Sequence, residues 1–328
     1  MDMLLEKMIN TFTTSSHEES MRNKIIDEID ILGLTYEIDK MDNLIVKLGT
    51  KSKNDKDIML VSHMDSVSLI VTFIDDNGYA RVGTVGEFNF EEWIGNLVEF
   101  ANGTIARVCA SKKEPKIADI YLDLFSNSKE ETIKKIQEGD VAILKKDVVK
   151  IEDKVIGSTL DSKISSYILL NTLMEITKDK EKIENLDHEI SFVFSTEKQL
   201  DGRGARAAAY KLDPSYCIVI DVEEANDTLG GDNKVKLNKG VGIHVLDRDL
   251  IVHHEVKEML EKSCKDLKID NQYIFNEKGT NGGRIHKERC GIKTGALSIP
   301  MRYKNTLNEV VKIKDIEDAI KVLLKVVE

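Results

Sequence analysis

The sequence predicts an α/β protein in which a small β-rich, barrel-like domain is inserted into a larger sheet-and-helix domain. Residues 58–61 form an unbroken apolar run of the kind found in strands buried in parallel sheets. Short strands joined by tight turns follow residue 66, and alternating strands and helices return near residue 155. We therefore assign residues 1–66 and 155–328 to one α/β domain, and residues 67–154 to the insertion.

The segment before the insertion contains two predicted helices and three predicted strands. In order, these are residues 3–12, 19–32, 36–39, 43–48 and 58–65. Apolar residues recur at helical spacing in the first two. Ser16 and Glu19 form the Ser-x-x-Glu pattern of a capping box, and Gly33 is a typical helix stop.

The insertion is predicted to be a small all-β barrel or sandwich. Its expected strands are residues 69–74, 79–85, 97–101 and 104–110, with further strand-like pieces up to residue 151. Asn77-Gly78 and Asn102-Gly103 provide the turn chemistry of β-hairpins. Residues 129–137 are the one stretch with helical spacing.

After the insertion, the pattern is again that of an α/β domain. The expected helices are residues 164–176, 202–210, 253–267, 282–289 and 315–327. The expected strands are residues 189–196, 216–222, 241–246, 271–275 and 293–299. Strands that alternate with helices in this way favour a largely parallel sheet.

Composition and charge exclude some classes of function. The net charge of −11 at pH 7 disfavours a nucleic-acid-binding or membrane-surface role. The four cysteines are far apart in sequence and form no zinc-ribbon or CxxC spacing, which fits a reducing cytoplasm. The N-terminus shows no signal peptide, and no apolar run approaches membrane-spanning length. We therefore expect a cytoplasmic protein with neither nucleic acid nor membrane as a partner.

Polar side chains stand where the predicted buried strands end. His63 and Asp65 close one strand, Asp221 closes another, and Asp161 begins a helix. The segment 197–199 follows a further strand. Each residue alone fits a turn or a helix cap, but the carboxyl ends of parallel strands meet at one edge of a sheet. Converging carboxylates and a histidine there are typical of a metal site for hydrolysis.

These motifs resemble the glutamyl-type, co-catalytic zinc aminopeptidases that assemble into tetrahedral dodecamers, a family with relatives labelled endoglucanases. The matching stretches cover nearly the whole chain in order. They are His63-Met64-Asp65, residues 156–161, Arg203-Gly204-Ala205, Val219-Ile220-Asp221, Asp227-Thr228, Lys239-Gly240, Gly279-Thr280, Ile285-His286 and residues 298–303. The resemblance implies a zinc-peptidase-like fold, and an inserted domain that serves dimerisation or assembly.

The resemblance also implies a site with two metal ions bridged by Asp161. One ion would take His63 and Asp221 as further ligands, with Asp65 orienting the histidine. An ungapped count back from Arg203 puts Lys198 at the general-base position of the family.

The same comparison finds changes at the ligands of the second metal. Gln199 and Asn305 stand at its two ligand positions, and Asn281 replaces an aspartate of the family. A register shift of one residue would instead make Glu197 the base, and that requires an insertion before Arg203.

Three functions follow as hypotheses. The first is an aminopeptidase fold that takes peptides but has lost the base and second metal, so that activity is weak or absent. The second is a working single-metal aminopeptidase that uses Glu197, and the third is a non-catalytic assembly or peptide-binding subunit. The expected cofactor is at most one divalent ion, zinc or cobalt, or none. The Lys198 ammonium would then lie near the missing metal and balance Asp161, and self-association is expected through residues 67–154.

Overall fold

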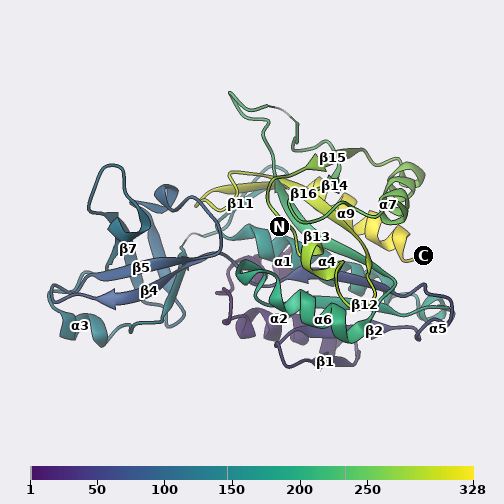
Figure 1. Cartoon of the computed structure of the whole chain (residues 1–328), viewed down its shortest axis with the longest axis horizontal. Coiled ribbons are helices and arrows are strands. Elements are labelled where there is room, and N and C mark those ends of the chain that lie inside the picture. The colour runs from purple at the N-terminus through teal and green to yellow at the C-terminus, as the bar shows by residue number, and fades with distance from the viewer. Residues whose placement is uncertain (1, 146, 233) are drawn as a thin grey trace.

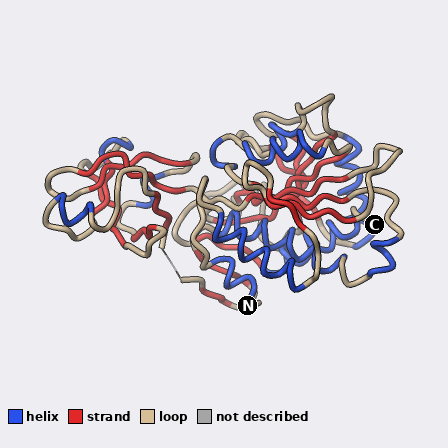
Figure 2. The backbone as a smooth tube through the Cα atoms, turned by 90° about the horizontal axis from the view of Figure 1, so that it is seen from below, coloured by secondary structure: helices blue, strands red, loops and turns tan. Residues whose placement is uncertain are grey.

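The computed structural model describes residues 2–145, 147–232 and 234–328, and it has two parts of unequal size (Figure 1). The larger is a mixed sheet flanked by helices on both faces, and the smaller is a closed antiparallel β-barrel (Figure 2). The predicted fold class, an α/β domain with an inserted barrel-like β domain, is therefore confirmed.

Four parallel strands form the centre of the large sheet. They are β12 (Ile190–Ser195), β3 (Ile58–His63), β13 (Tyr216–Glu224) and β16 (Lys293–Arg302), in that spatial order. β12 and β3 are buried along their whole length, as expected for strands covered on both faces. Parallel pairing brings the carboxyl ends of all four strands to one edge of the sheet.

Antiparallel strands extend this centre on both sides. They are β1 (Tyr36–Ile38), β2 (Leu44–Leu48), β10 (Val149–Ile151), β11 (Lys154–Gly157), β14 (Val241–Leu246) and β17 (Glu309–Lys312), and β15 (Asn271–Phe275) pairs in parallel with β14. β10 falls within the range 67–154 that we assigned to the insertion, but it pairs with β11 in the large sheet.

Helices cover the two faces of this sheet unequally. They are α1 (Met3–Ile9), α2 (Glu19–Ile31), α4 (Leu160–Ile176), α5 (Lys180–Glu184), α6 (Arg203–Leu212), α7 (His254–Leu267), α8 (Gly282–Ile285) and α9 (Ile313–Val326). α4 is buried on almost every side, because it packs on β3 and β13 and is covered by α1 and α9. A second, smaller apolar core lies between the sheet and α6. Of the described helices, none is both long and apolar enough to cross a membrane.

The barrel closes in the order β4-β5-β8-β7-β6-β9. The strands are β4 (Ser68–Ile74), β5 (Ala80–Val85), β6 (Leu97–Phe100), β7 (Ile105–Ala110), β8 (Ile120–Asp123) and β9 (Val141–Leu144), with α3 (Lys129–Ile133) outside. Every second residue of these strands fills the barrel core: Leu69, Val71, Ala80, Val82, Val98, Phe100, Ala106, Val108, Ile120, Leu122, Ala142 and Leu144. The sequence did not distinguish a barrel from a sandwich, and the structure shows a closed barrel.

The barrel contacts the α/β domain through the loop after β16. The buried Trp93 donates from its indole nitrogen to the backbone oxygen of Asn305 at 2.9 Å. Leu307, from the same loop, packs against the barrel core. The insertion is thus anchored to the segment that follows Arg302, close to the polar residues considered below.

Three local expectations were wrong. The predicted helix 129–137 is only the short α3, and the predicted helix 282–289 is only α8. The Ser-x-x-Glu pattern is not a capping box, because α2 starts one residue after its N-cap Glu18 and has no side-chain cap. The Ser16 hydroxyl instead donates to Glu197, a residue far along the chain, at 2.8 Å.

We expect Phe192→Ala to destabilise the protein strongly. The Phe192 side chain is fully buried in the main core between the sheet and α4, so its removal should lower the free energy of unfolding by about 3–5 kcal/mol. Phe275→Ala is the matched control, because the side chain of Phe275 in the same sheet is 68% exposed. Urea unfolding followed by circular dichroism measures both. Equal losses for the two variants would contradict the assigned core.

Candidate functional site

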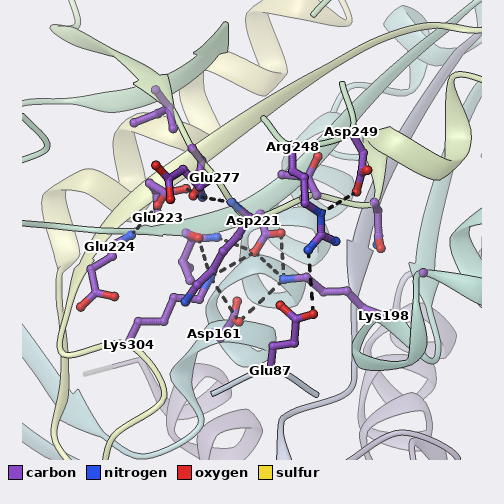
Figure 3. A pocket seen from close by; sticks show the side chains of 18 of the residues that line it. Glu87, Asp161, Lys198, Asp221, Glu223, Glu224, Arg248, Asp249, Glu277 and Lys304 are labelled. Atoms are coloured by element: carbon purple, nitrogen blue, oxygen red, sulfur yellow. Dashed lines mark hydrogen bonds and ion pairs between the residues drawn. The ribbon is translucent and has the colours of Figure 1, made fainter. Parts of the chain in front are cut away.

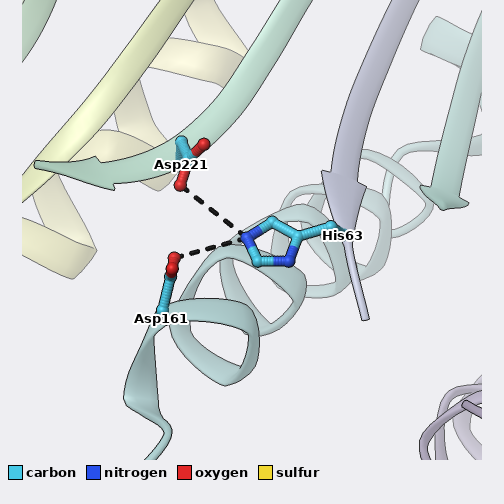
Figure 4. A group of neighbouring side chains, drawn as sticks. All are labelled: His63, Asp161 and Asp221. Atoms are coloured by element: carbon cyan, nitrogen blue, oxygen red, sulfur yellow. Dashed lines mark hydrogen bonds and ion pairs between the residues drawn. The ribbon is translucent and has the colours of Figure 1, made fainter. Parts of the chain in front are cut away.

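Three side chains with metal-binding donors meet at the carboxyl edge of the parallel strands (Figure 4). His63 ends β3, Asp221 lies near the end of β13, and Asp161 lies in the first turn of α4. His63 Nε2 is 3.3 Å from Asp161 Oδ1 and 3.7 Å from Asp221 Oδ1. All three residues are buried, and their donor atoms lie within 4.8 Å of one another. The structure therefore brings together the three residues that the sequence assigned to one metal.

Strand register explains why His63 and Asp221 meet. β3 and β13 pair in parallel with Val61 opposite Val219, so the residues two further along in each strand lie side by side. Residues two apart in a strand point to the same face, which puts both side chains over the start of α4. The Ser166 hydroxyl of α4 donates to the His63 carbonyl oxygen at 2.9 Å, which holds this helix against β3.

Asp65 holds the loop after β12. Its carboxylate accepts hydrogen bonds from the backbone N–H groups of Lys198 and Gln199 at 3.0 and 2.9 Å, and from the Ser15 hydroxyl at 2.7 Å. The His63 ring contacts the backbone oxygen of Asp65 at 2.9 Å through Nδ1, whereas the carboxylate is 3.6 Å away. Asp65 thus orients His63 mainly through its main chain, and its side chain positions Lys198.

Lys198 extends its ammonium group into the centre of this cluster (Figure 3). Its Nζ lies 3.0 Å from His63 Nε2, 2.8 Å from Asp221 Oδ2 and 3.7 Å from Asp161 Oδ2. A hydrogen bond between two nitrogen bases requires one donor and one acceptor. Because a lysine ammonium group has donors only, a hydrogen bond at this contact makes His63 Nε2 the acceptor.

A second lysine, Lys304, reaches the same carboxylates and was missed in the sequence. Its Nζ is 3.5 Å from Asp161 Oδ2 and 4.0 Å from Asp221 Oδ1, and it donates to the Val222 carbonyl oxygen at 2.9 Å. The available signal was its place directly before Asn305 in the stretch that follows Arg302-Tyr303. A residue beside a ligand position is easily overlooked, because its direction depends on the backbone conformation of the loop.

The two lysines keep the aspartates ionised. Burial alone would raise the pKa of Asp161, but Lys198 and Lys304 lower it to about 2. The pKa of Asp221 is likewise well below its usual value, because the same two ammonium groups outweigh its burial. Burial lowers the pKa of Lys304, but Asp161 and Asp221 more than reverse this and raise it above its usual value.

The remaining altered positions line a cavity beside this cluster. Gln199 packs against Gly86 of the barrel domain, where φ is +90° and a Cβ atom would meet the Gln199 side-chain oxygen at 2.9 Å. Asn305 lies in a left-handed backbone conformation with φ of +64°, and its N–H donates to Glu309 at 2.6 Å. Gln199, Asn281 and Asn305 all line the cavity.

Glu197 is turned away from His63. Its carboxylate accepts from the Ser16 hydroxyl at 2.8 Å and pairs with Arg203 at 3.6 Å, and its backbone N–H donates to Glu18. Glu197 is absent from the lining of the cavity, which Lys198 and Gln199 do line. Lys198, and not Glu197, is therefore the residue of this segment that faces His63.

The cavity beside these residues is large enough for a peptide. Its volume is about 960 Å³, and it runs from Asp161 and Lys304 to the exposed strand β15, where Tyr273 and Phe275 line it. Charged residues of both signs surround it, including Glu87, Glu223, Glu224, Arg248, Asp249 and Glu277 (Figure 3). Glu87 belongs to the barrel domain and pairs with Arg248 of the α/β domain at 3.8 Å, so both domains build its wall.

The donor set does not fit a divalent ion as the residues stand. Histidine and two carboxylates are suitable ligands, and three protein ligands are typical of catalytic zinc. However, Lys198 Nζ is within hydrogen-bonding distance of His63 and Asp221, two of the three ligands. An ion could bind all three only after this ammonium group moved out.

Known proteins match this chain over nearly its whole length. The profile of a family described as M42 glutamyl aminopeptidase matches residues 42–322, which is most of the chain. A protein of Acetivibrio thermocellus, whose own assignment as an aminopeptidase is provisional, is 34% identical over 99% of this chain and 97% of its own length. The lysyl aminopeptidase of Pyrococcus furiosus is 25% identical over 99% of this chain and 96% of its own.

A solved structure is similar over the same length. The TET1 peptidase of Pyrococcus horikoshii, which assembles into a tetrahedron or a large octahedral shell, has a TM-score of 0.87 and 25% identity. The match covers 99% of this chain and 98% of that one. The similarity thus includes the barrel as well as the α/β domain.

We expect Glu18→Gln to stabilise the protein more at pH 8 than at pH 5. Burial and the nearby Asp65 raise the pKa of Glu18 from 4.5 to about 7, so folding disfavours its ionised form. Its contribution to stability is therefore lost as pH rises from about 4.5 through about 7. The variant should gain up to about 3 kcal/mol near pH 8, since one pKa unit is worth about 1.4 kcal/mol.

Urea unfolding at both pH values measures this gain, with Glu19→Gln as the control, because Glu19 is the exposed neighbour in the chain. The control should change the free energy of unfolding by no more than about 0.5 kcal/mol at either pH. A gain for Glu18→Gln that is larger at pH 5 than at pH 8 would contradict the sign of the shift.

Proposed function

Because the chain belongs to the M42 glutamyl aminopeptidase family, we propose that it binds the N-terminal part of peptides in the cavity beside His63 but hydrolyses them weakly or not at all. Removal of N-terminal residues by a metal-dependent site is the activity of this family. The observation that carries the proposal is the lack of a group able to take a proton from water at the family's general-base position.

General-base catalysis needs a group that is unprotonated and free to accept. Lys198, at the base position, donates to Asp221 at 2.9 Å and lies 3.0 Å from His63 Nε2, so its amine is already engaged. Asp161 has a low pKa and is paired with two lysines, so it is a poor acceptor. Glu197 is bound by Ser16 and Arg203. None of these three groups is ready to activate a water molecule.

The metal content we propose is at most one divalent ion, zinc or cobalt, at His63, Asp161 and Asp221, or none. Neutral amide oxygens such as those of Gln199 and Asn305 are weaker zinc ligands than the carboxylate and imidazole they replace. A dication and an ammonium group about 4 Å apart repel by about 8 kcal/mol at an effective dielectric of 20. Neither amide offsets this repulsion, which disfavours a second ion.

A working single-metal hydrolase is the second candidate. It requires Glu197 to leave Ser16 and Arg203 and to turn into the cavity, and it requires Lys198 to move away from His63. No described contact favours either movement. We therefore favour peptide binding with little or no hydrolysis over a working single-metal hydrolase.

Self-association through the barrel is part of the proposal. Relatives with this fold form closed shells, and the outer surface of the barrel exposes apolar side chains on β4 and α3. A non-catalytic assembly subunit would use the same surface. The predicted cytoplasmic location also stays a proposal, with which the four free cysteines, of which Cys290 alone is exposed, are compatible.

We expect the wild type to show little or no hydrolysis of aminoacyl p-nitroanilides with added zinc or cobalt. The combined variant Lys198→Glu, Gln199→Glu and Asn305→His should bind two metal ions and hydrolyse these substrates at least about 100-fold faster, because it regains a base. Lys278→Glu is the control, since it makes the same charge change as Lys198→Glu elsewhere in the cavity. Robust zinc-dependent turnover by the wild type, abolished by Glu197→Gln, would establish the second candidate instead.

We expect the wild type to be larger than a monomer in solution, and Phe73→Glu with Ile133→Glu to reduce its size. These side chains are 50% and 52% exposed on the barrel, and burying a charge at an interface is unfavourable. Ile251→Glu, at a 79% exposed position of the α/β domain, is the control. Light scattering coupled to gel filtration measures the mass. A monomeric wild type at micromolar concentration would refute self-association.

A further inference from the structure

We propose that Lys198 and Lys304 together replace the metal centre: their ammonium groups supply the positive charge that the buried carboxylates need, and the folded chain holds no divalent ion there. This inference deepens the proposed function and rests on it for the role of the cavity. It concerns charge and stability, so it can fail while peptide binding holds, and the reverse.

The Lys198 ammonium makes contacts that a metal ion at this place would make. A protonated lysine has three N–H donors and no acceptor. Lys198 Nζ has one acceptor in His63 Nε2 at 3.0 Å and another in Asp221 Oδ1 at 2.9 Å, with Asp161 Oδ2 beyond at 3.7 Å. These are the same three residues that form the candidate metal-ligand set. Lysine and ion therefore exclude each other.

Lys304 supplies the second charge from the opposite side of the aspartates (Figure 3). It lies near the oxygens of both Asp161 and Asp221 and donates to the Val222 carbonyl oxygen. The side chains of Lys198 and Lys304 are only 13% and 19% exposed. Because water reaches them so little, both charges act mainly on the aspartates and are poorly screened by salt.

The cluster already pairs two ammonium groups with two carboxylates. Lys198 Nζ lies 3.7 Å from Asp161 and 2.8 Å from Asp221, and Lys304 Nζ lies 3.5 and 4.0 Å from the same two residues. A divalent ion added without loss of a lysine would leave two uncompensated positive charges in a buried volume, which is strongly unfavourable.

Both lysines are held in place by their own backbone. Lys304 stands between Tyr303 and Asn305, whose φ values of +60° and +64° are unusual for residues other than glycine. Glu309 is fully buried and fixes this turn, because it accepts from the N–H of Asn305 and from the N–H of Leu160, the neighbour of Asp161. The turn that carries Lys304 and the helix that carries Asp161 are thereby tied together.

Lys198 is fixed in a similar way, through the hydrogen bond from its backbone N–H to Asp65. Lysines on a flexible surface loop would have neither restraint. The arrangement is therefore a built site for two ammonium groups, in which the main chain, as well as the side-chain charges, sets where each nitrogen lies.

The test compares zinc binding by the wild type and by Lys198→Met, which keeps the length of the side chain and removes its charge. Each purified protein is dialysed against zinc and then against buffer, and zinc per chain is measured by elemental analysis. Melting temperatures are recorded with zinc and with a chelator. Lys278→Met is the matched control, because Lys278 lines the cavity but has no described ion pair with Asp161 or Asp221.

We expect the wild type and the control to retain almost no zinc and to melt at the same temperature in zinc and in chelator. Lys198→Met should retain about one zinc ion per chain, and its melting temperature should rise with zinc concentration, as for any ligand of the folded state. Adding His63→Ala to Lys198→Met should abolish both effects, which assigns the ion to this cluster. Lys304→Met should melt at a lower temperature than the wild type, because a buried negative charge is left unpaired.

Tightly held zinc in the wild type, or a zinc-dependent rise in its melting temperature, would overturn the inference. A folded Lys198→Met variant that binds no zinc would also overturn it. If that variant fails to fold, crystals of the wild type soaked in zinc decide the matter. An anomalous peak within coordination distance of His63, Asp161 and Asp221 contradicts the inference, and density for the Lys198 ammonium with no such peak supports it.

Discussion

The parallel register of β3 and β13 is the constraint on which the candidate site depends. It brings a histidine and an aspartate to the same edge of the sheet, directly above the first turn of α4. The strands are held there by apolar burial on both faces, and α4 is held by packing against the sheet and by the Ser166 hydrogen bond to His63. The close approach of three ionisable groups is thus a consequence of the core and is not set by local sequence.

Once such groups are buried together, their charges must be compensated. Divalent ions can compensate buried carboxylates in a protein and can also activate water. In this chain, two lysines contact the same carboxylates, and the pKa values of Asp161 and Asp221 fall accordingly. A change from ion to ammonium keeps the electrostatic support of the fold but removes the Lewis acid. A metal centre serves both stability and catalysis, whereas two lysines would serve stability alone.

The inserted barrel takes part in this site as well as in any assembly. Trp93 bonds the backbone oxygen of Asn305, Leu307 enters the barrel core, and Gly86 packs against Gln199. The loop that presents Lys304 is therefore braced by the inserted domain. A surface that joins copies of the chain would lie on the same small domain that contacts this loop.

The fold class and the cluster of His63, Asp161 and Asp221 could be predicted from the sequence. Apolar runs and turn residues mark buried strands, and parallel strands share an edge, so the convergence of polar residues at strand ends could be read directly. The ungapped count also put Lys198 beside these residues. The hydrogen-bond partner of Ser16 could not be predicted. Its hydroxyl bonds Glu197, a distant residue, and does not cap the helix.

Where Glu197 and Lys198 point, and the part of Lys304, became visible only in the tertiary structure. In a tight turn, backbone angles decide the direction of each side chain, and neighbours one residue apart can point oppositely. Glu197, with φ of +51°, points to Ser16 and Arg203, whereas the next residue reaches His63. Lys304 reaches Asp161 because left-handed residues on both sides turn the chain there. Such conformations depend on contacts between distant segments, which local patterns do not encode.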